Sequence, residues 1–176
     1  LMTITLLESV DKLNGYVNDC IKNRVKILPV DINKSLRGFV AEPEGIRFAL
    51  LAVKSLGEGA IASIVGEREQ NGEFKSLQDF CTRMTGKEVT VKGVEQLIKS
   101  GAMDCFANNR HEMINAYEGL MQAAAQDSKT NLAGQLDLFG MGDGAYSEKI
   151  IEPAEEYPHA TLLEFEHEAL GMYISG

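Results

Sequence analysis

The sequence is short of the residues that build metal centres and membrane spans. It has three cysteines, Cys20, Cys81 and Cys105, which are far apart and never form a C-x-x-C pair. This spacing argues against a zinc or iron–sulfur site. No apolar run approaches the length of a membrane span. We therefore expect a cytoplasmic protein with reduced, buried thiols, no metal site and no membrane partner.

Basic residues are scarce in the last third of the chain. Residues 1–110 hold 15 of the 17 Lys and Arg and 14 of the 26 Asp and Glu, whereas residues 111–176 hold the other 2 and 12. The first part is therefore close to neutral, and nearly all of the net charge of −9 lies in the second. Such asymmetry indicates two separate tasks. A nearly neutral first part also predicts that any binding to nucleic acid is weak.

The most informative stretch runs from Arg47 to Val65. Apolar residues at helical spacing lead up to Lys54, residues 55–59 break the helix with two glycines, and helical spacing resumes at Ile61. Two short helices joined by a tight glycine turn form the pattern of a helix-hairpin-helix. Glycine allows a phosphate to approach the backbone, and the unpaired N–H groups that begin the second helix favour an anion.

This pattern predicts a site that holds a nucleic-acid phosphate without reading bases. The expected contacts are Lys54, Ser55, Leu56, Gly57, Glu58, Gly59 and Ala60. Two features depart from the usual pattern, because Ser55 stands where a first glycine is common and Glu58 puts an acid at the tip. The alternative is an ordinary pair of helices in which the glycines only terminate a helix.

Residues 94–101 repeat this arrangement, since another apolar helix ends in apolar-Lys-Ser and then glycine. The repeat predicts a second hairpin that contacts DNA through Lys99, Ser100 and Gly101, although its turn is degenerate and could serve only to complete the fold. Lys54, Lys92 and Lys99 are the basic residues best placed to meet phosphates, the alternative for each being a solvated surface lysine.

The remaining patterns predict a mainly α fold with a small β-hairpin. The expected elements are a first helix interrupted at Gly15, a helix over 16–23, strands over 25–29, 39–41 and 46–48, a short helix capped by Ser76 to Asp79, a helix beginning near Thr90, a helix over 109–126 and an acidic helix over 161–173. In the helix over 109–126, the predicted buried stripe is Met113, Ala116, Tyr117, Leu120 and Met121. His111, near its start, is expected to be an ordinary surface residue.

From residue 127 to 159 the composition changes to that of a loop, long enough to need a functional reason. Within it lie Gln135, Leu136, Asp137, Leu138 and Phe139. The apolar members either fold back on the helices or form a short peptide whose Leu-Phe pair binds in another protein's pocket.

Several stretches together resemble the α (catalytic) subunits of bacterial DNA polymerase III. They are residues 25–33, 45–48, 54–61, 74–80, 97–104 and 168–176. The resemblance implies a piece of a longer protein, with the end of the fingers over 1–46 and tandem helix-hairpin-helix motifs over 47–126. A loop over 127–158 would then carry the internal sliding-clamp-binding motif at 135–139. A helix over 159–176 would lead to an oligonucleotide-binding domain that is absent here.

The resemblance also implies the partners: double-stranded DNA, the sliding clamp (β subunit) and, through the parent protein, the other holoenzyme subunits. The parent is a DNA-directed DNA polymerase expected to use Mg²⁺, and the family's catalytic carboxylates lie upstream, so we expect this piece to have no catalytic residue and no cofactor of its own.

Two other functions stay open at the sequence level. A helix-hairpin-helix repair enzyme, a glycosylase or nuclease, would need a catalytic Asp shortly after its hairpin. Asp79 is the one acid in reach, and a helix cap explains it better. The second is a purely structural helical connector.

Overall fold

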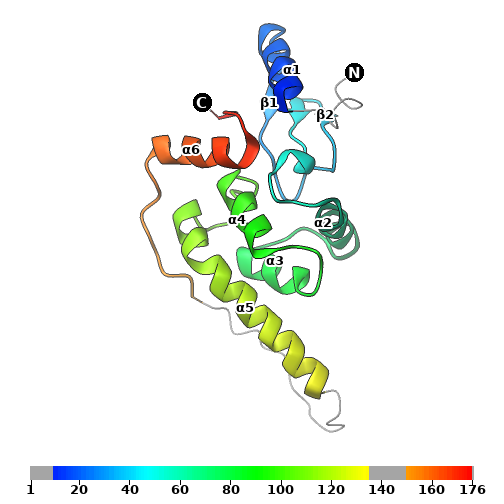
Figure 1. Ribbon diagram of the computed structural model, residues 1–176, viewed down its shortest axis with the longest axis vertical. Helices are drawn as coiled ribbons and strands as arrows, with labels where there is room; N and C mark the ends of the chain where they lie inside the picture. The colour runs from blue at the N-terminus through cyan, green and yellow to red at the C-terminus, as the bar shows by residue number, and fades with distance from the viewer. Residues whose placement is uncertain (1–9, 135–149, 176) are drawn as a thin grey trace.

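The computed structural model describes residues 10–134 and 150–175. Helices dominate these residues, and Figure 1 shows α1 and a small sheet at one end and the long α5 at the other. The elements are α1 (Val10–Lys22), β1 (Ile27–Leu28), β2 (Val40–Glu42), β3 (Gly45–Arg47), the 3-10 helix η1 (Leu50–Ala52), α2 (Glu58–Asn71), α3 (Leu77–Met84), α4 (Val91–Lys99), α5 (Arg110–Gly134) and α6 (His159–Leu170). The predicted mainly α class with a small β-hairpin is confirmed.

The sheet has the strand order β1-β3-β2, with β1 parallel and β2 antiparallel to β3. The residues Glu-Pro-Glu-Gly at 42–45 form the turn that joins β2 to β3 in the predicted β-hairpin. Gly45 begins the central strand, where a Cβ would collide with the carbonyl of Lys26. The sheet therefore needs glycine at this point for close approach of the backbones.

Gly15 does not interrupt the first helix, contrary to the sequence prediction, because α1 is continuous across it. One glycine inside a helix costs about 1 kcal/mol relative to alanine. That cost is offset here by packing, since Leu13 and Val17 on either side of Gly15 are buried.

The helix predicted to precede the first turn is also wrong in extent, since only η1 forms there. The backbone N–H of Phe48 bonds to Leu28, and those of Leu50 and Leu51 bond to Leu36 and Arg37. These donors hold the segment against β1 and the following loop, so they are not available for an α-helical ladder.

The predicted cap of α3 and the predicted start of α4 near Thr90 are both confirmed. Ser76 Oγ accepts from the N–H of Asp79, and Thr90 Oγ1 accepts from the N–H of Gly93. Asp79 also accepts from Lys75 N–H and from Arg83, which ties its carboxylate to the cap. The catalytic role that a repair enzyme would need therefore has no support at Asp79.

The core lies where α3 and α4 pack against α5 and where α6 crosses α4. Met113, Tyr117 and Leu120 of the predicted stripe on α5 are buried, and its other two members are half-buried. α5 reaches Gly134, so residues 127–134 are helical where a loop was predicted. α6 ends at Leu170, where Gly171 caps it in the left-handed conformation, so the prediction that this helix runs to residue 173 is wrong.

Candidate nucleic-acid interface

The first turn is built on a strained residue and a buried anchor. Ser55 has a φ of +61°, the left-handed region that favours glycine. Leu56 next to it is 6% exposed, and its Cδ1 lies near Gly93 at the start of α4. The turn is therefore pinned by its apolar residue, and Ser55 adopts the conformation for which the usual pattern supplies a glycine.

Gly57 is the N-cap of α2 and has an extended backbone, with φ −74° and ψ 162°. The residue of this turn with a positive φ is therefore Ser55 and not a glycine. A Cβ on Gly57 would meet only open space. Glycine also offers no side chain to cap the helix. Among the described residues, none provides a side-chain acceptor for the first amides of α2, and these amides are where an anion is favoured.

Acidic residues flank these amides. Glu58 binds the guanidinium of Arg37 through two hydrogen bonds, of 2.6 Å to Nη2 and 3.2 Å to Nε. The hydrogen bond from Arg37 lowers the pKa of Glu58. The carboxylate of Glu88 lies against Gly59. The acid at the tip is thus neutralised by an arginine that sequence reasoning missed, because nothing in the local pattern links positions 37 and 58.

The lysines differ in their surroundings. Lys54 and Lys92 are exposed, so both side chains can reach a ligand. Lys99 is only 13% exposed and pairs with Glu95 at 2.7 Å and Glu168 at 2.9 Å. Burial would lower the pKa of Lys99, but the hydrogen bonds to these two carboxylates raise it above its ordinary value. The charge of Lys99 is therefore neutralised by ion pairs within the protein.

The second predicted turn is a helix terminus packed into the core. Ser100 is 2% exposed, and Gly101 is buried with a φ of +80°. The N–H of Gly101 bonds to Ile98 and that of Ala102 bonds to Leu97, which is a Schellman motif. This buried, hydrogen-bonded helix end matches the alternative in which the second turn serves only to complete the fold.

The N-terminus of α5 is closed by side chains of the protein itself. Asn109 Oδ1 accepts from Glu112 N–H, and Glu112 returns the bond to Asn109 N–H, as in a capping box. The carboxylate of Glu156 accepts from the N–H of Arg110 at 3.0 Å and from that of His111 at 3.2 Å. The two hairpins therefore differ, since α2 begins without a side-chain cap whereas α5 begins under two.

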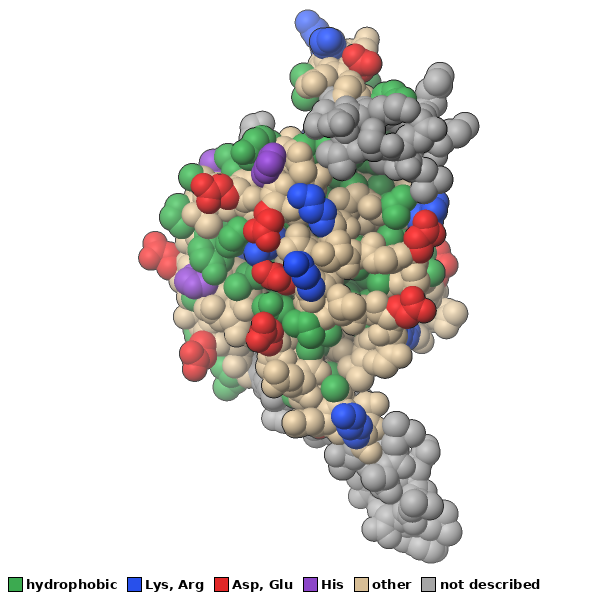
Figure 2. All heavy atoms as spheres, in the orientation of Figure 1, with side chains coloured by type: hydrophobic (Ala, Val, Ile, Leu, Met, Phe, Trp, Pro, Cys, Tyr) green, Lys and Arg blue, Asp and Glu red, His purple; other side chains and the backbone are tan. Residues whose placement is uncertain are grey.

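Charge of one sign does not gather on the face drawn in Figure 2, where basic and acidic side chains alternate. The clamp-binding prediction at residues 135–139 lies outside the described residues. Within residues 10–134 and 150–175, no group of three or more His, Cys, Asp or Glu could hold a metal ion. The same residues include no helix long and apolar enough to cross a membrane.

Comparison with known proteins identifies the family. The model of the helix-hairpin-helix motif matches residues 24–113, about half of the chain. The DNA polymerase III subunit alpha of Deinococcus radiodurans is 40% identical over 100% of this chain and 13% of its own length. Those of Saccharopolyspora erythraea and Escherichia coli strain K12 are 34% and 33% identical, over 96% and 97% of this chain. Each of these two is matched over 15% of its own length.

The chain thus spans about one seventh of the curated relatives that it matches. The resemblance to these subunits extends over nearly the whole chain, well beyond the residues of the motif itself. The chain therefore belongs to the helix-hairpin-helix motif family, and it is similar to one segment of the replicative DNA polymerase III alpha subunit.

Proposed function

We propose that this chain is a non-catalytic part of a replicative polymerase that binds the backbone of duplex DNA without sequence preference. The observation that carries the proposal is the start of α2, where Gly57 leaves the first amides without a side-chain cap beside an exposed turn. Backbone amides at a helix N-terminus bind phosphate oxygens and are indifferent to base identity.

The proposed contact surface is narrower than the one that the sequence predicted. It keeps residues 54–60 and Lys92, and it adds Arg37 through its place beside Glu58. It omits Lys99, Ser100 and Gly101, because Lys99 is ion-paired and the backbone N–H groups of the other two already bond to Gln96 and Ile98. With so few free basic groups, binding is weak and falls as salt rises.

Gly57→Asp tests this proposal. An aspartate at an N-cap stabilises a helix, and its carboxylate would occupy the amides that a phosphate needs. The Cβ has open space, so the turn is kept. Duplex affinity, measured by fluorescence anisotropy, should fall while the melting temperature holds or rises. Gly119→Asp is the matched control, because it adds the same charge at an open position on α5.

Equal effects of the two variants on duplex affinity would contradict the proposal and favour the structural connector. Sequence preference among duplexes of different sequence would contradict it as well, because phosphate contacts carry no base information.

We also propose that residues 135–139 bind a sliding clamp as an extended peptide. The support is the resemblance of these residues to the family's internal clamp-binding motif, and their place after α5 in the chain. Leu138 and Phe139 would enter an apolar pocket, and the Gln135 amide would hydrogen-bond at its edge. Together with DNA binding, this second weak contact would tether the polymerase, since linked contacts multiply their affinities.

The polymerase reaction and its Mg²⁺ belong, in this proposal, to other parts of a full-length alpha subunit. The described residues do not fit a magnesium site, because they include no cluster of carboxylates that could hold one. The other holoenzyme subunits would be reached through the same parent protein.

A further inference from the structure

Residues 150–158, called the strap here, lie along the start of α5 and lead into α6 (Figure 1). Besides the two hydrogen bonds of Glu156, the Nδ1–H of His111 donates to the carbonyl of Glu155 at 2.6 Å. The His111 ring stacks on Tyr157, with ring centroids 4.3 Å apart. Thus His111, expected to be an ordinary surface residue, is part of a docking site.

The capping residues of α5 bind the strap as well. Asn109 Nδ2 donates to the carbonyl of Ala154 at 2.7 Å, and Glu112 Oε1 accepts from the N–H of Ala154 at 3.3 Å. The same residues thus close the helix end and hold the strap over it. Ring contacts of Tyr157 with His111 and with Phe165 of α6 also hold the strap, and Ile151 packs against the core. The polar contacts at the helix terminus can be exchanged for others of the same chemistry.

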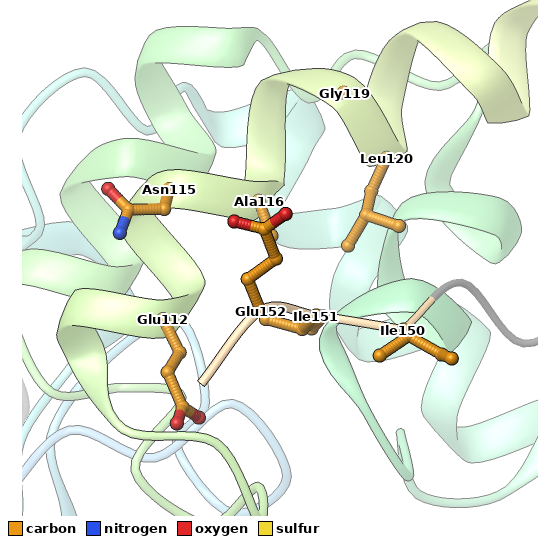
Figure 3. Close-up of a pocket in the computed structure, with 8 residues that line it drawn as sticks. All are labelled: Glu112, Asn115, Ala116, Gly119, Leu120, Ile150, Ile151 and Glu152. Atoms are coloured by element: carbon orange, nitrogen blue, oxygen red, sulfur yellow. The ribbon is translucent and has the colours of Figure 1, made fainter. Parts of the chain in front are cut away.

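The strap brings negative charge to the second hairpin. Glu152, Glu155 and Glu156 lie within a span of five residues that contains no basic residue. Figure 3 shows Glu112 and Glu152 among the residues lining an open hollow of about 250 Å³ between α5 and the strap. These carboxylates and the phosphates of DNA are both negative and repel each other, so the docked strap keeps phosphates away from this end of α5.

We propose that the strap is an autoinhibitory contact, in which Glu156 occupies in cis the α5 amides that a DNA phosphate would take at the second hairpin. This inference rests on the proposed backbone binding by the first hairpin. While the strap is docked, only the first hairpin is open to the duplex. Release of the strap uncovers the amides of Arg110 and His111. It also moves the three carboxylates of the strap away from the second hairpin.

The test compares Glu156→Gln with Glu155→Gln in the whole chain. Both variants remove one negative charge from neighbouring strap positions, but the exposed Glu155 side chain holds no α5 amide. Glu156→Gln should bind a short duplex more tightly than Glu155→Gln by roughly threefold to tenfold at 0.1 M salt, because one further phosphate contact releases about one counterion. Equal affinities of the two variants overturn the inference.

Hydrogen exchange supplies a second measurement on the unmodified chain, independent of whether Glu156→Gln folds. The N–H of Ala154 is held by Glu112. Its exchange should accelerate when saturating duplex displaces the strap, and unchanged or slower exchange overturns the inference. If Gly57→Asp abolishes binding while the two strap variants bind alike, the proposed function stands and the strap inference fails. If no form of the chain binds duplex, both fail.

Discussion

The backbone N–H of Lys54 donates to the carbonyl of Ala169 at 2.9 Å, which joins the first turn to the end of α6. α6 lies outside the residues that the helix-hairpin-helix model matches. Ala169 is fully buried, and its neighbour Glu168 binds Lys99 of α4. The turn is therefore held in place by a helix far along the chain, and its geometry belongs to the whole fold.

Ser55→Gly should stabilise the protein. A left-handed residue with a Cβ costs roughly 1–2 kcal/mol, and part of this is returned because glycine is more flexible in the unfolded chain. We expect a net gain of about 0.5–1 kcal/mol in the free energy of unfolding, measured by urea denaturation.

Ser55→Ala is the control for this change, because alanine keeps the Cβ and with it the strain of the φ of +61°. It should give no gain. A Ser55→Gly variant less stable than the wild type would mean that the serine hydroxyl contributes more to the turn than the strain removes.

Glu58→Gln should strengthen duplex binding. Arg37 is half-exposed and is neutralised by Glu58 at the start of α2. Without the carboxylate, its guanidinium is free to meet a phosphate, so the slope of log K against log salt should steepen by about 0.9. Glu69→Gln removes the same charge from an exposed position on the same helix. A similar change of slope in both variants would show that the loss of one negative charge from the protein, and not the release of Arg37, causes the effect.

Stability should fall in acid through Glu67. The hydrogen bond from Lys87 is the main cause that lowers the pKa of Glu67 to about 2, with further bonds from Asn71 and Arg83, against the opposing effect of burial. Because this pKa is depressed in the folded state, the stabilisation is complete above the ordinary carboxyl pKa of 4.5 and is lost as the pH falls toward 2. Melting temperatures between pH 5 and about 2 should record this loss.

Glu67→Gln should be less stable at neutral pH and should flatten this part of the pH profile. The exposed Glu69 of the same helix provides the control, since Glu69→Gln should leave the acid slope of the melting temperature as in the wild type. An unchanged slope in Glu67→Gln would assign acid unfolding to other carboxylates.

Leu138→Ala combined with Phe139→Ala should abolish binding to a purified bacterial sliding clamp. Burying each apolar side chain contributes about 1.5–3 kcal/mol, so the pair, less the cost of ordering the peptide, accounts for roughly micromolar affinity. Isothermal titration calorimetry would measure the loss.

Asp137→Ala is the matched control for the clamp experiment, because Asp137 alternates with the apolar anchors and should contribute least to binding. Circular dichroism should show unchanged helix content in the double variant. Loss of helix content would place Leu138 and Phe139 in the core of this chain, contrary to the peptide hypothesis.

The starts of α3 and α4 were predictable from the sequence alone. Ser76 with Asp79 and Thr90 with Gly93 act through hydrogen bonds between residues three positions apart. The buried face of α5 was predictable for the same reason, because helical periodicity repeats over a few residues. The stop at Gly171 was missed, because the predicted helix ran to residue 173. The resemblance of the chain to DNA polymerase III alpha subunits was also visible in the sequence, and comparison confirmed it.

Only the tertiary structure decided which of the predicted phosphate contacts remain available. Lys99 pairs with Glu168, Arg37 pairs with Glu58, and Glu156 covers the start of α5. Each pair joins residues at least 21 positions apart, a separation at which no local pattern specifies a partner. Likewise, η1 stays short because the amides of Phe48 and Leu50 bond to distant carbonyls. Local chemistry set the caps of α3 and α4, whereas the packing of distant segments set the extent of η1 and which charges and amides stay free to bind.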